Sequence, residues 1–261
     1  MKIWQKKAKI ISNYKLADKY LRAVLHTAKI ARIAAPGQFV MLKIDNSLTP
    51  LLRRPFSIHR VDGSKIEVLY EVVGEATEIL SKRKAGGHID VIGPLGNGFD
   101  CRAPHTGHRR RPILVAGGMG VAPLVFLAKN FKKVKGLVLI GAKTKKQILC
   151  EKEFQRLGFD VKIATDDGSL GFKGKVTGLL EKILLSAVSC QLSAVYACGP
   201  RPMLKEISRI SNKYNIPAQI SLEEHMACGI GACLGCVVNT KEGFKRVCKE
   251  GPVFWAEEIL W

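Results

Sequence analysis

The sequence predicts a multidomain chain: a β-rich N-terminal module, an α/β domain built on a parallel sheet, and a small cysteine-rich C-terminal part. Short apolar runs bounded by turn residues fill the N-terminal part, strand and helix patterns then alternate, and cysteines gather near the end. The 261 residues suffice for two domains or one large one. A composition of 47% hydrophobic and 25% charged residues excludes disordered and fibrous classes.

The β-rich module is predicted over residues 1–107. Its apolar runs are separated by Pro, Gly, Asn and Asp residues at close spacing. They are Phe39–Ile44, Ser57–Arg60, Lys65–Val73 and His88–Ile92. Runs of this length and spacing are typical of the strands of a barrel or a sandwich.

The α/β domain is predicted over 108–220, after a basic, Pro- and Gly-containing linker at 102–111. Apolar strand patterns, from Pro112–Ala116 to Ala194–Ala197, alternate there with helix patterns. This alternation predicts βαβ units and a parallel sheet. The remaining segment, 221–261, is too short to bury a core without a staple.

The C-terminal cysteines have the spacing C-x4-C-x2-C-x11-C, formed by Cys228, Cys233, Cys236 and Cys248. The first two spacings are those of a plant-type [2Fe–2S] loop, whose fourth cysteine comes later. Gly229, Gly231 and Gly235 allow the loop to fold tightly, with positive φ where needed. A structural zinc site and unligated thiols are the alternatives. A four-thiolate zinc site usually has two close cysteine pairs, and only one is present here, so the spacing favours the cluster.

The charge balance and the termini limit the class of protein. Forty-two Lys and Arg residues against 22 Asp and Glu give a net charge of +20, which suggests nucleic acid, an anionic membrane surface, phosphate-bearing ligands or an acidic partner. A Lys-rich background spread over solvated faces is the alternative. No stretch resembles a membrane span or a secretory signal. Eight cysteines without a signal favour metal or redox use, so we expect a cytoplasmic protein.

The run Arg53-Arg54-Pro55-Phe56-Ser57 stands at the start of a predicted strand. A flavin dinucleotide needs a cation at its pyrophosphate and a small hydroxyl donor near the flavin N5. Arg54 and Ser57 offer these two groups, and Pro55 fixes the backbone between them. A solvated arginine pair in front of a strand is the alternative.

Three further turns lie between a strand and a helix, where backbone N–H groups favour phosphate. At Gly74–Leu80 the alternative is a simple helix capped by Thr77. The loop Gly117–Gly120 leads into a helix but lacks the G-x-G-x-x-G fingerprint, and a plain glycine-rich turn is its alternative. The third turn is Cys198-Gly199-Pro200. Because the carboxyl ends of parallel strands converge, we expect the last two loops to face one dinucleotide, with a buried structural thiol as the alternative role of Cys198.

The order of these motifs resembles the ferredoxin-NADP reductase superfamily: Arg-Pro-Phe-Ser, then Gly-Gly-Met-Gly-Val-Ala-Pro, then Cys-Gly-Pro. The segments from Met226 to Cys236 and from Arg246 to Phe254 look like those of electron transfer subunits of class 1B (NAD-dependent) dihydroorotate dehydrogenase. This resemblance covers nearly the whole chain. It implies an FAD-binding antiparallel β-barrel over 1–107, an NAD-binding domain over 108–220 and a [2Fe–2S] domain over 221–261.

The resemblance also implies which residues bind each cofactor. Those expected at FAD are Arg54, Pro55, Phe56, Ser57, Tyr70, Glu71, Val72, Ala76 and Thr77. Those expected at NAD(H) are Gly118, Met119, Gly120, Val121, Cys198, Gly199 and Pro200, and the cluster ligands are Cys228, Cys233, Cys236 and Cys248. The family usually has Gly at the position of Ala76 and basic residues at those of Glu224 and His225. No catalytic acid or base is expected in this chain.

The implied activity is electron transfer in de novo pyrimidine (UMP) biosynthesis. An FMN-containing catalytic subunit would oxidise dihydroorotate to orotate, and electrons would pass through the cluster and FAD of this chain to NAD+. The implied assembly is a heterotetramer of two subunits of each kind, without nucleic acid or a membrane span. One alternative is another ferredoxin or NAD(P)H oxidoreductase subunit, bifurcating or hydrogenase-associated, although those often have Asp in place of Cys228. The other is a zinc-stabilised nucleic-acid-binding protein.

Overall fold

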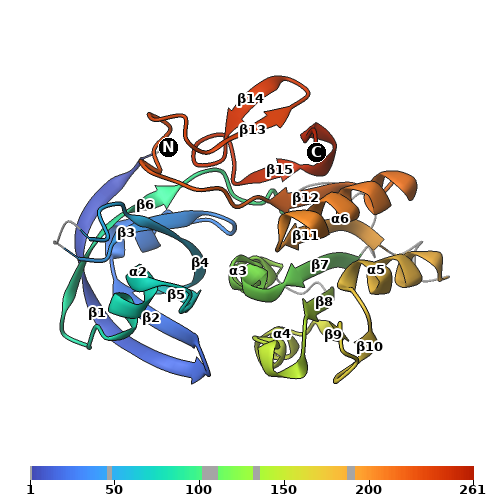
Figure 1. Cartoon of the computed structure of the whole chain (residues 1–261), viewed down its shortest axis with the longest axis horizontal. Coiled ribbons are helices and arrows are strands. Elements are labelled where there is room, and N and C mark those ends of the chain that lie inside the picture. The colour runs from blue at the N-terminus through green and yellow to red at the C-terminus, as the bar shows by residue number, and fades with distance from the viewer. Residues whose placement is uncertain (1, 46–48, 102–110, 132–135, 187–191) are drawn as a thin grey trace. The chain divides into compact units, whose positions relative to one another are not determined.

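The chain divides into two compact units, seen in a computed structural model that describes residues 2–45, 49–101, 111–131, 136–186 and 192–261 (Figure 1). The first unit comprises Met1–Gly98, Glu224–Val238 and Phe244–Pro252. The second comprises Phe99–Glu223, Asn239–Gly243 and Val253–Trp261. The predicted linker at 102–111, apart from Arg111, and the predicted boundary between 107 and 108 lie outside the described residues.

The first unit contains a closed antiparallel barrel with the strand order β1-β2-β5-β4-β3-β6. Of the two predicted architectures, a barrel and a sandwich, the structure therefore confirms the barrel. Its strands are β1 (Trp4–Ala17), β2 (Tyr20–His26), β3 (Phe39–Lys43), β4 (Arg54–Asp62), β5 (Lys65–Glu71) and β6 (His88–Leu95). Two short helices, α1 (Ala28–Ala31) and α2 (Glu75–Ser81), connect them. Along β1 the side chains alternate, since Ala8 and Ile10 are buried while Lys7 and Lys9 face solvent.

The second unit is built on a seven-stranded sheet with the order β10-β9-β8-β7-β11-β12-β15. The strands are β7 (Arg111–Gly117), β8 (Leu137–Ala142), β9 (Asp160–Thr165), β10 (Phe172–Lys173), β11 (Leu192–Cys198), β12 (Ala218–Ser221) and β15 (Val253–Trp255). All pairs are parallel except β12 with β15, which confirms the predicted parallel sheet and adds an antiparallel edge strand.

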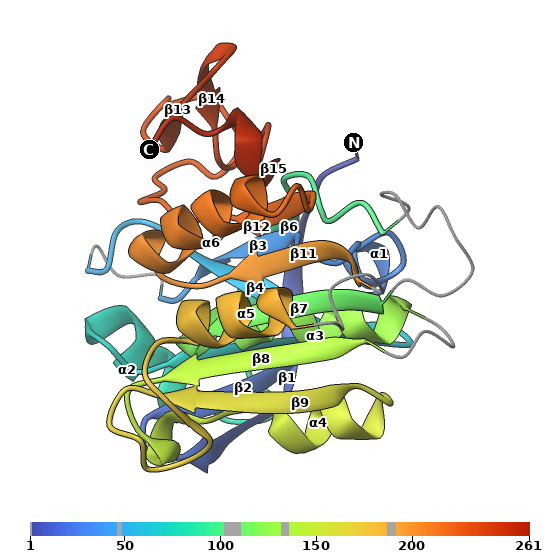
Figure 2. The ribbon, with the colours of Figure 1, turned by 90° about the vertical axis from the view of Figure 1, so that its right-hand side faces the viewer.

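Helices cover both faces of this sheet, with α5 and α6 on one face and α3 and α4 on the other (Figure 2). They are α3 (Val121–Asn130), α4 (Glu151–Arg156), α5 (Val176–Leu185) and α6 (Arg201–Lys213). Covered on both sides, β7 is buried from Pro112 to Gly117, which explains its continuous apolar run. Single turns of 3₁₀ helix occur at η1 (Gly118–Gly120), η2 (Lys145–Gln147) and η4 (Ala256–Glu258).

The C-terminal segment contributes to both units. It contains a two-stranded sheet of β13 (Val237–Thr240) and β14 (Gly243–Arg246), and then β15. A segment too short for its own core therefore gains burial by adding its pieces to two larger cores.

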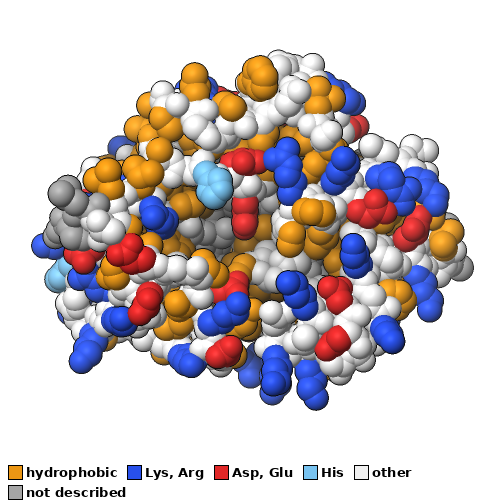
Figure 3. Space-filling view, viewed as in Figure 1, with side chains coloured by type: hydrophobic (Ala, Val, Ile, Leu, Met, Phe, Trp, Pro, Cys, Tyr) orange, Lys and Arg blue, Asp and Glu red, His pale blue; other side chains and the backbone are white. Residues whose placement is uncertain are grey.

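The structure bears on two predictions from the sequence, the spread of the positive charge and the lack of a membrane span. On the face drawn in Figure 3, Lys and Arg side chains are dispersed and do not form one block. On this face the distribution agrees with the solvated-background interpretation of the net charge. Among the described residues, no helix combines the length and the apolar character needed to traverse a bilayer.

Candidate functional site

The two arginines at the start of β4 have different partners. Arg53 forms a forked ion pair with Asp90, with Nη2 at 2.9 Å from Oδ2 and Nη1 at 3.2 Å from Oδ1. Although burial raises the pKa of Asp90, hydrogen bonds from Arg53 and Gln5 hold it below its ordinary value. Arg54 is half-buried, donates to the Leu52 carbonyl at 2.7 Å, and makes no ion pair with a described residue. Arg54 is thus the arginine whose charge is available to a phosphate.

The other residues expected at FAD lie on three neighbouring elements of the barrel unit. Pro55 is exposed and Ser57 half-buried, while Phe56 is buried and packs edge-on against Tyr70 with ring centroids 5.9 Å apart. Tyr70 itself is only 2% exposed, and its hydroxyl donates to Asn13 Oδ1 at 2.9 Å. Burial raises the pKa of Tyr70 to about 12, with the Asn13 hydrogen bond acting against it. Phe56 and Tyr70 are therefore part of the buried core of the barrel unit.

The end of β5 and the start of α2 complete this group. Glu71 pairs with Lys19 at 2.5 Å, and the Val72 N–H donates to the Lys19 carbonyl at 2.8 Å. Gly74 is the N-cap residue of α2, so the alternative that made Thr77 the cap is wrong. Thr77 lies at the third helical position, and its hydroxyl accepts from the Gly74 N–H at 3.2 Å. The expected FAD residue Ala76 is 7% exposed.

The two loops expected to face NAD(H) lie side by side in the second unit. They follow the neighbouring parallel strands β7 and β11, in which Ala116 is paired with Cys198. A Cβ on Gly120 would lie 2.0 Å from the Cys198 carbonyl oxygen, so this contact requires glycine. An added Cβ on Gly118 would meet nothing within 4 Å, although its φ is +54°. The structure thus brings together all seven residues expected here: Gly118, Met119, Gly120, Val121, Cys198, Gly199 and Pro200.

Within this pair of loops the residues differ in exposure. Gly118 and Met119 are half-buried and Pro200 is exposed, so these three are accessible to a ligand. Cys198 is 1% exposed. Burial and the negative charge of Glu223 raise the pKa of Cys198 despite a hydrogen bond with Ser221. Cys198 therefore contributes its backbone to this pair of loops, while its thiol is buried.

The four predicted cluster ligands belong to the barrel unit and form two pairs. In the first pair, the Cys233 N–H lies 3.4 Å from Cys228 Sγ; in the second, the Cys248 N–H lies 3.4 Å from Cys236 Sγ. Cys236 and Cys248 are buried, Cys228 is half-buried and Cys233 is exposed. Two thiolates for each of two irons match this pairing.

The chemistry of these donors fits an iron–sulfur cluster. Burial opposes ionisation of Cys228, but hydrogen bonds from backbone N–H groups of the loop and from the Cys233 side chain lower its pKa to about 6, which favours the thiolate form that binds iron. Burial and the neighbouring Cys236 raise the pKa of Cys248 to about 12, as expected for a buried thiol packed against another thiol. The same four thiolates also match a structural zinc site, so the donor set alone leaves both metals open.

The backbone of the cysteine loop adopts conformations that favour glycine. Gly229 and Gly231 have φ of +69° and +84°, as predicted. Gly235 is not among the residues with positive φ, and Leu234 at +58° is instead. A Cβ on Gly229 would lie 2.5 Å from Cγ of Met41 in β3, so the loop rests directly on the barrel.

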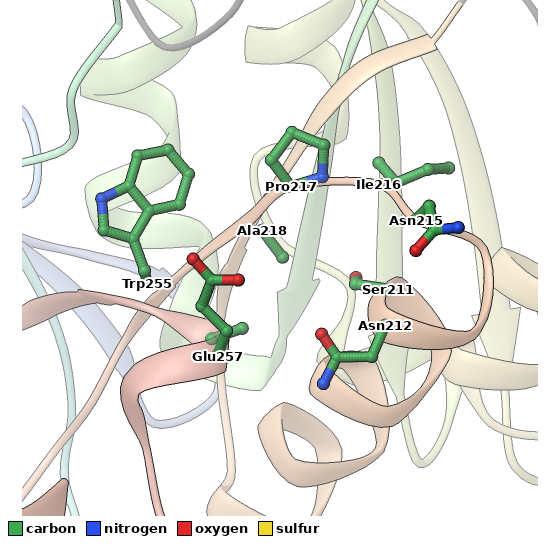
Figure 4. A pocket seen from close by; sticks show the side chains of 9 residues that line it. Ser211, Asn212, Asn215, Ile216, Pro217, Ala218, Trp255 and Glu257 are labelled. Carbon is green, nitrogen blue, oxygen red and sulfur yellow. The ribbon is translucent and has the colours of Figure 1, made fainter. Parts of the chain in front are cut away.

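A separate pocket lies at the end of the second unit's sheet that is opposite to the two glycine loops. Its volume is about 590 Å³, and it is bounded by the end of α6, the start of β12 and the Trp255–Glu257 segment (Figure 4). It lies at the amino end of β12, whereas the two glycine loops follow the carboxyl ends of their strands. None of the predicted site residues lines it.

These features define a class of protein: a reductase-type electron carrier with an antiparallel barrel, a nucleotide-binding parallel sheet and a four-cysteine loop. Family comparisons agree, since the iron–sulfur cluster binding domain of dihydroorotate dehydrogenase B matches residues 223–260 and the oxidoreductase NAD-binding domain matches 114–209. The first match confirms the iron–sulfur assignment of the cysteine segment over zinc.

Curated relatives identify the family. The chain is 42% identical over 99% of both chains to the dihydroorotate dehydrogenase B (NAD(+)) electron transfer subunit of Caldanaerobacter subterraneus subsp. tengcongensis. It is 41% identical to those of Desulforamulus reducens, over 97% of both chains, and Bacillus pumilus, over 96% of both. The chain belongs to the family of dihydroorotate dehydrogenase B electron transfer subunits.

Solved structures support the same fold. An NADH-dependent reduced ferredoxin-NADP oxidoreductase, described for flavin-based electron bifurcation, matches with a TM-score of 0.84 and 28% identity over 98% of this chain and 90% of that one. A ferredoxin NADP+ reductase from Neisseria gonorrhoeae, solved with bound FAD and NADP, matches with a TM-score of 0.66 and 16% identity over 80% of this chain and 91% of that one. The second likeness concerns the fold alone.

Proposed function

We propose that this chain carries electrons from a dihydroorotate-oxidising, FMN-containing catalytic subunit to NAD+ in de novo pyrimidine biosynthesis in the cytoplasm. One observation carries the proposal beyond family membership. Gly229 of the cysteine loop contacts Met41, and Met41 is the cross-strand partner of Pro55 in the Arg-Pro-Phe-Ser strand. Paired residues on adjacent strands share a face of the sheet. The cluster ligands are therefore anchored beside the strand to which we assign the flavin.

Each part of the chain receives one cofactor in this proposal: residues 1–107 FAD, 108–220 NAD(H) and 221–261 the [2Fe–2S] cluster. When bound, FAD supplies the exchange between a two-electron hydride and single electrons. Arg54 neutralises the pyrophosphate, and Ser57 offers its hydroxyl near the flavin N5. Gly118–Val121 and Cys198–Pro200 form the nicotinamide side. None of these residues acts as a general acid or base, because proton abstraction belongs to the catalytic subunit.

The cysteine segment also offers a surface for that subunit. Between Cys228 and Cys248, four apolar side chains are at least 40% exposed, namely Ile230, Leu234, Val237 and Phe244. Contiguous exposed apolar surface is a feature of protein interaction sites. We assign this surface to the catalytic subunit in a complex with two subunits of each kind.

The decisive experiment is a coupled assay without oxygen. The chain is mixed with the FMN-containing dihydroorotate dehydrogenase of the same organism, dihydroorotate is added, and NADH is followed by its absorbance. We expect NADH only when both subunits are present. If the chain holds FAD and a cluster but the mixture produces no NADH, the dihydroorotate assignment is refuted.

The Cys236→Ala variant tests the path through the chain. We expect it to lose the cluster and the coupled activity while it keeps FAD and NADH-dependent dye reduction, because Cys236 lies in the loop and not among the nucleotide-binding residues. The electron paramagnetic resonance signal of the reduced cluster gives the answer. A normal [2Fe–2S] signal in this variant would contradict the ligand assignment.

A second candidate function is electron transfer between ferredoxin and NAD(P)H, as in a bifurcating complex. It is favoured by the 28% identity over 98% of this chain to the NADH-dependent reduced ferredoxin-NADP oxidoreductase. Reduced ferredoxin in place of the dihydroorotate system distinguishes the two functions. NAD+ reduction by ferredoxin, and none by dihydroorotate with its catalytic subunit, would favour this candidate.

A further inference from the structure

One arginine side chain joins the two halves of the cysteine segment. Nη1 of Arg246 donates to the Gly231 carbonyl at 2.7 Å, and Gly231 lies between the first two cluster cysteines. Nε of the same guanidinium donates to Glu250 Oε2 at 2.9 Å, and Nη2 pairs with Oε1. Arg246 stands two residues before Cys248. The Arg246 guanidinium thus connects the loop that carries Cys228 and Cys233 to the segment that carries Cys248.

The Arg246–Glu250 pair is itself fixed to the barrel. The Glu250 carbonyl accepts from Asn97 Nδ2 at 2.9 Å, and the Asn97 N–H donates to the Gly251 carbonyl at 2.5 Å. The Arg246 N–H also donates to Glu250 Oε2 at 2.8 Å. Asn97 thus fixes the backbone of Glu250 and Gly251 to the barrel, and the Glu250 carboxylate in turn holds the guanidinium near Gly231.

The guanidinium lies close to the segments that carry the cluster ligands. It donates to the carbonyl of Gly231, in the loop between Cys228 and Cys233, and Arg246 is two residues from Cys248. Groups behind the ligands of a metal site orient those ligands and tune the metal. A positive charge beside a cluster favours its reduced form, because reduction adds a negative charge.

We propose that Arg246 is a positioning residue of the iron–sulfur centre: it fixes the Cys228–Cys233 loop against the Cys248 segment and keeps a positive charge beside the cluster that raises its reduction potential. This inference rests on the proposed function only in requiring that the chain holds the cluster. It concerns a residue that is not a ligand.

The test uses the full chain with its cofactors, purified without oxygen, in four variants. Arg246→Gln removes the positive charge and the paired hydrogen bonds of the guanidinium. Arg246→Lys keeps the charge but cannot form those paired hydrogen bonds. Glu250→Gln removes the negative charge of the carboxylate and keeps the arginine. Arg209→Gln is the matched control, because Arg209 makes the same forked pair with Glu206 on the surface of α6. Iron content and bound FAD show whether each variant is assembled.

Two readouts follow: the rate at which a chelator removes iron, and the midpoint potential from a redox titration monitored by electron paramagnetic resonance. We expect Arg246→Gln to release iron about tenfold faster and to shift the potential to more negative values. Glu250→Gln should shift it in the opposite direction, since the remaining arginine charge is no longer balanced. Arg246→Lys should release iron faster than the native chain with a nearly native potential. Arg209→Gln should change neither quantity.

Opposite shifts in the two charge variants support the proposal, since a merely structural ion pair would not produce them. An unchanged potential in both Arg246→Gln and Glu250→Gln overturns it, whatever the rate of iron release. If the native chain holds no iron, the proposed function fails first, so the two failures are distinguishable. Should Arg246→Gln not assemble, the signs for Arg246→Lys and Glu250→Gln decide the question.

Discussion

Replacing Gly229 by alanine tests whether the cysteine loop is anchored on the barrel. An added Cβ would lie 2.5 Å from Cγ and 2.9 Å from Sδ of Met41, whose side chain is fully buried. The φ of Gly229 is +69°, a conformation that costs other residues roughly 1–2 kcal/mol. Overpacking a buried site adds about 1–3 kcal/mol. We expect Gly229→Ala to lower the free energy of unfolding by about 2–5 kcal/mol in all.

Gly243→Ala is the matched control, because Gly243 has a φ of +97° but open space where its Cβ would stand. It carries the backbone cost without the clash. Urea unfolding under anaerobic conditions, followed by circular dichroism, compares the two variants. With a slope of about 2 kcal/mol per molar urea, the extra clash lowers the midpoint of Gly229→Ala by about 0.5–1.5 M relative to the control.

A double-mutant cycle with Met41→Ala isolates the contact. Met41→Ala alone leaves a cavity that costs about 2–5 kcal/mol. Adding Gly229→Ala to that background should cost less than in the native chain by about 1–3 kcal/mol, since the clash is gone. Equal midpoints for Gly229→Ala and Gly243→Ala, or strict additivity in the cycle, would refute the anchoring of the loop on β3.

Three further predictions concern the proposed nucleotide-binding residues. Arg54→Ala should weaken FAD binding while leaving barrel stability nearly unchanged, whereas Arg53→Ala should destabilise the barrel because it leaves Asp90 without its cation; FAD content and thermal unfolding of both variants separate the two roles. Gly120→Ala should reduce NADH-dependent dye reduction by about a hundredfold, because its Cβ meets backbone 2.0 Å away, and Gly118→Ala should fold with less disturbance; equal losses would count against this geometry. The pKa of Tyr70 rises from 10.0 to about 12 on folding, so its contribution to stability is present below pH 10 and is lost between pH 10 and about 12. Tyr70→Phe should show a shallower loss in that interval, measured by urea unfolding at a series of pH values.

Local sequence predicted those parts of the structure whose geometry is encoded by neighbouring residues. The four-cysteine spacing and the glycine loops after β7 and β11 each require a backbone conformation that the residues themselves favour. β1 was not predicted, because its Lys-rich outer face hides a buried face that contains Ala8 and Ile10. Thr77 is not the cap of α2, because Gly74 occupies the N-cap position. Thr77 lies three residues later and accepts a hydrogen bond from the Gly74 N–H.

The features that sequence could not predict depend on partners distant in the chain. β15 pairs with β12 more than thirty residues earlier, and the Asn97 side chain binds Glu250 across a separation of 153 residues. The different roles of Arg53 and Arg54 likewise depend on Asp90, which comes from another strand. No local pattern indicates such pairings, because they depend on how whole elements pack.

The alternation of the C-terminal segment between the two units has a consequence for biosynthesis. The edge of β12 stays open until Val253–Trp255 arrives, and the outer face of β3 lacks its cover until the cysteine loop has been made. Neither unit has all of its native contacts until the segments Phe244–Pro252 and Val253–Trp255 have been made, and contacts across such separations form slowly. A chain truncated near residue 220 would expose an unpaired strand edge that invites aggregation. Synthesis of the chain through Trp255 is therefore required before both units can reach their complete native fold.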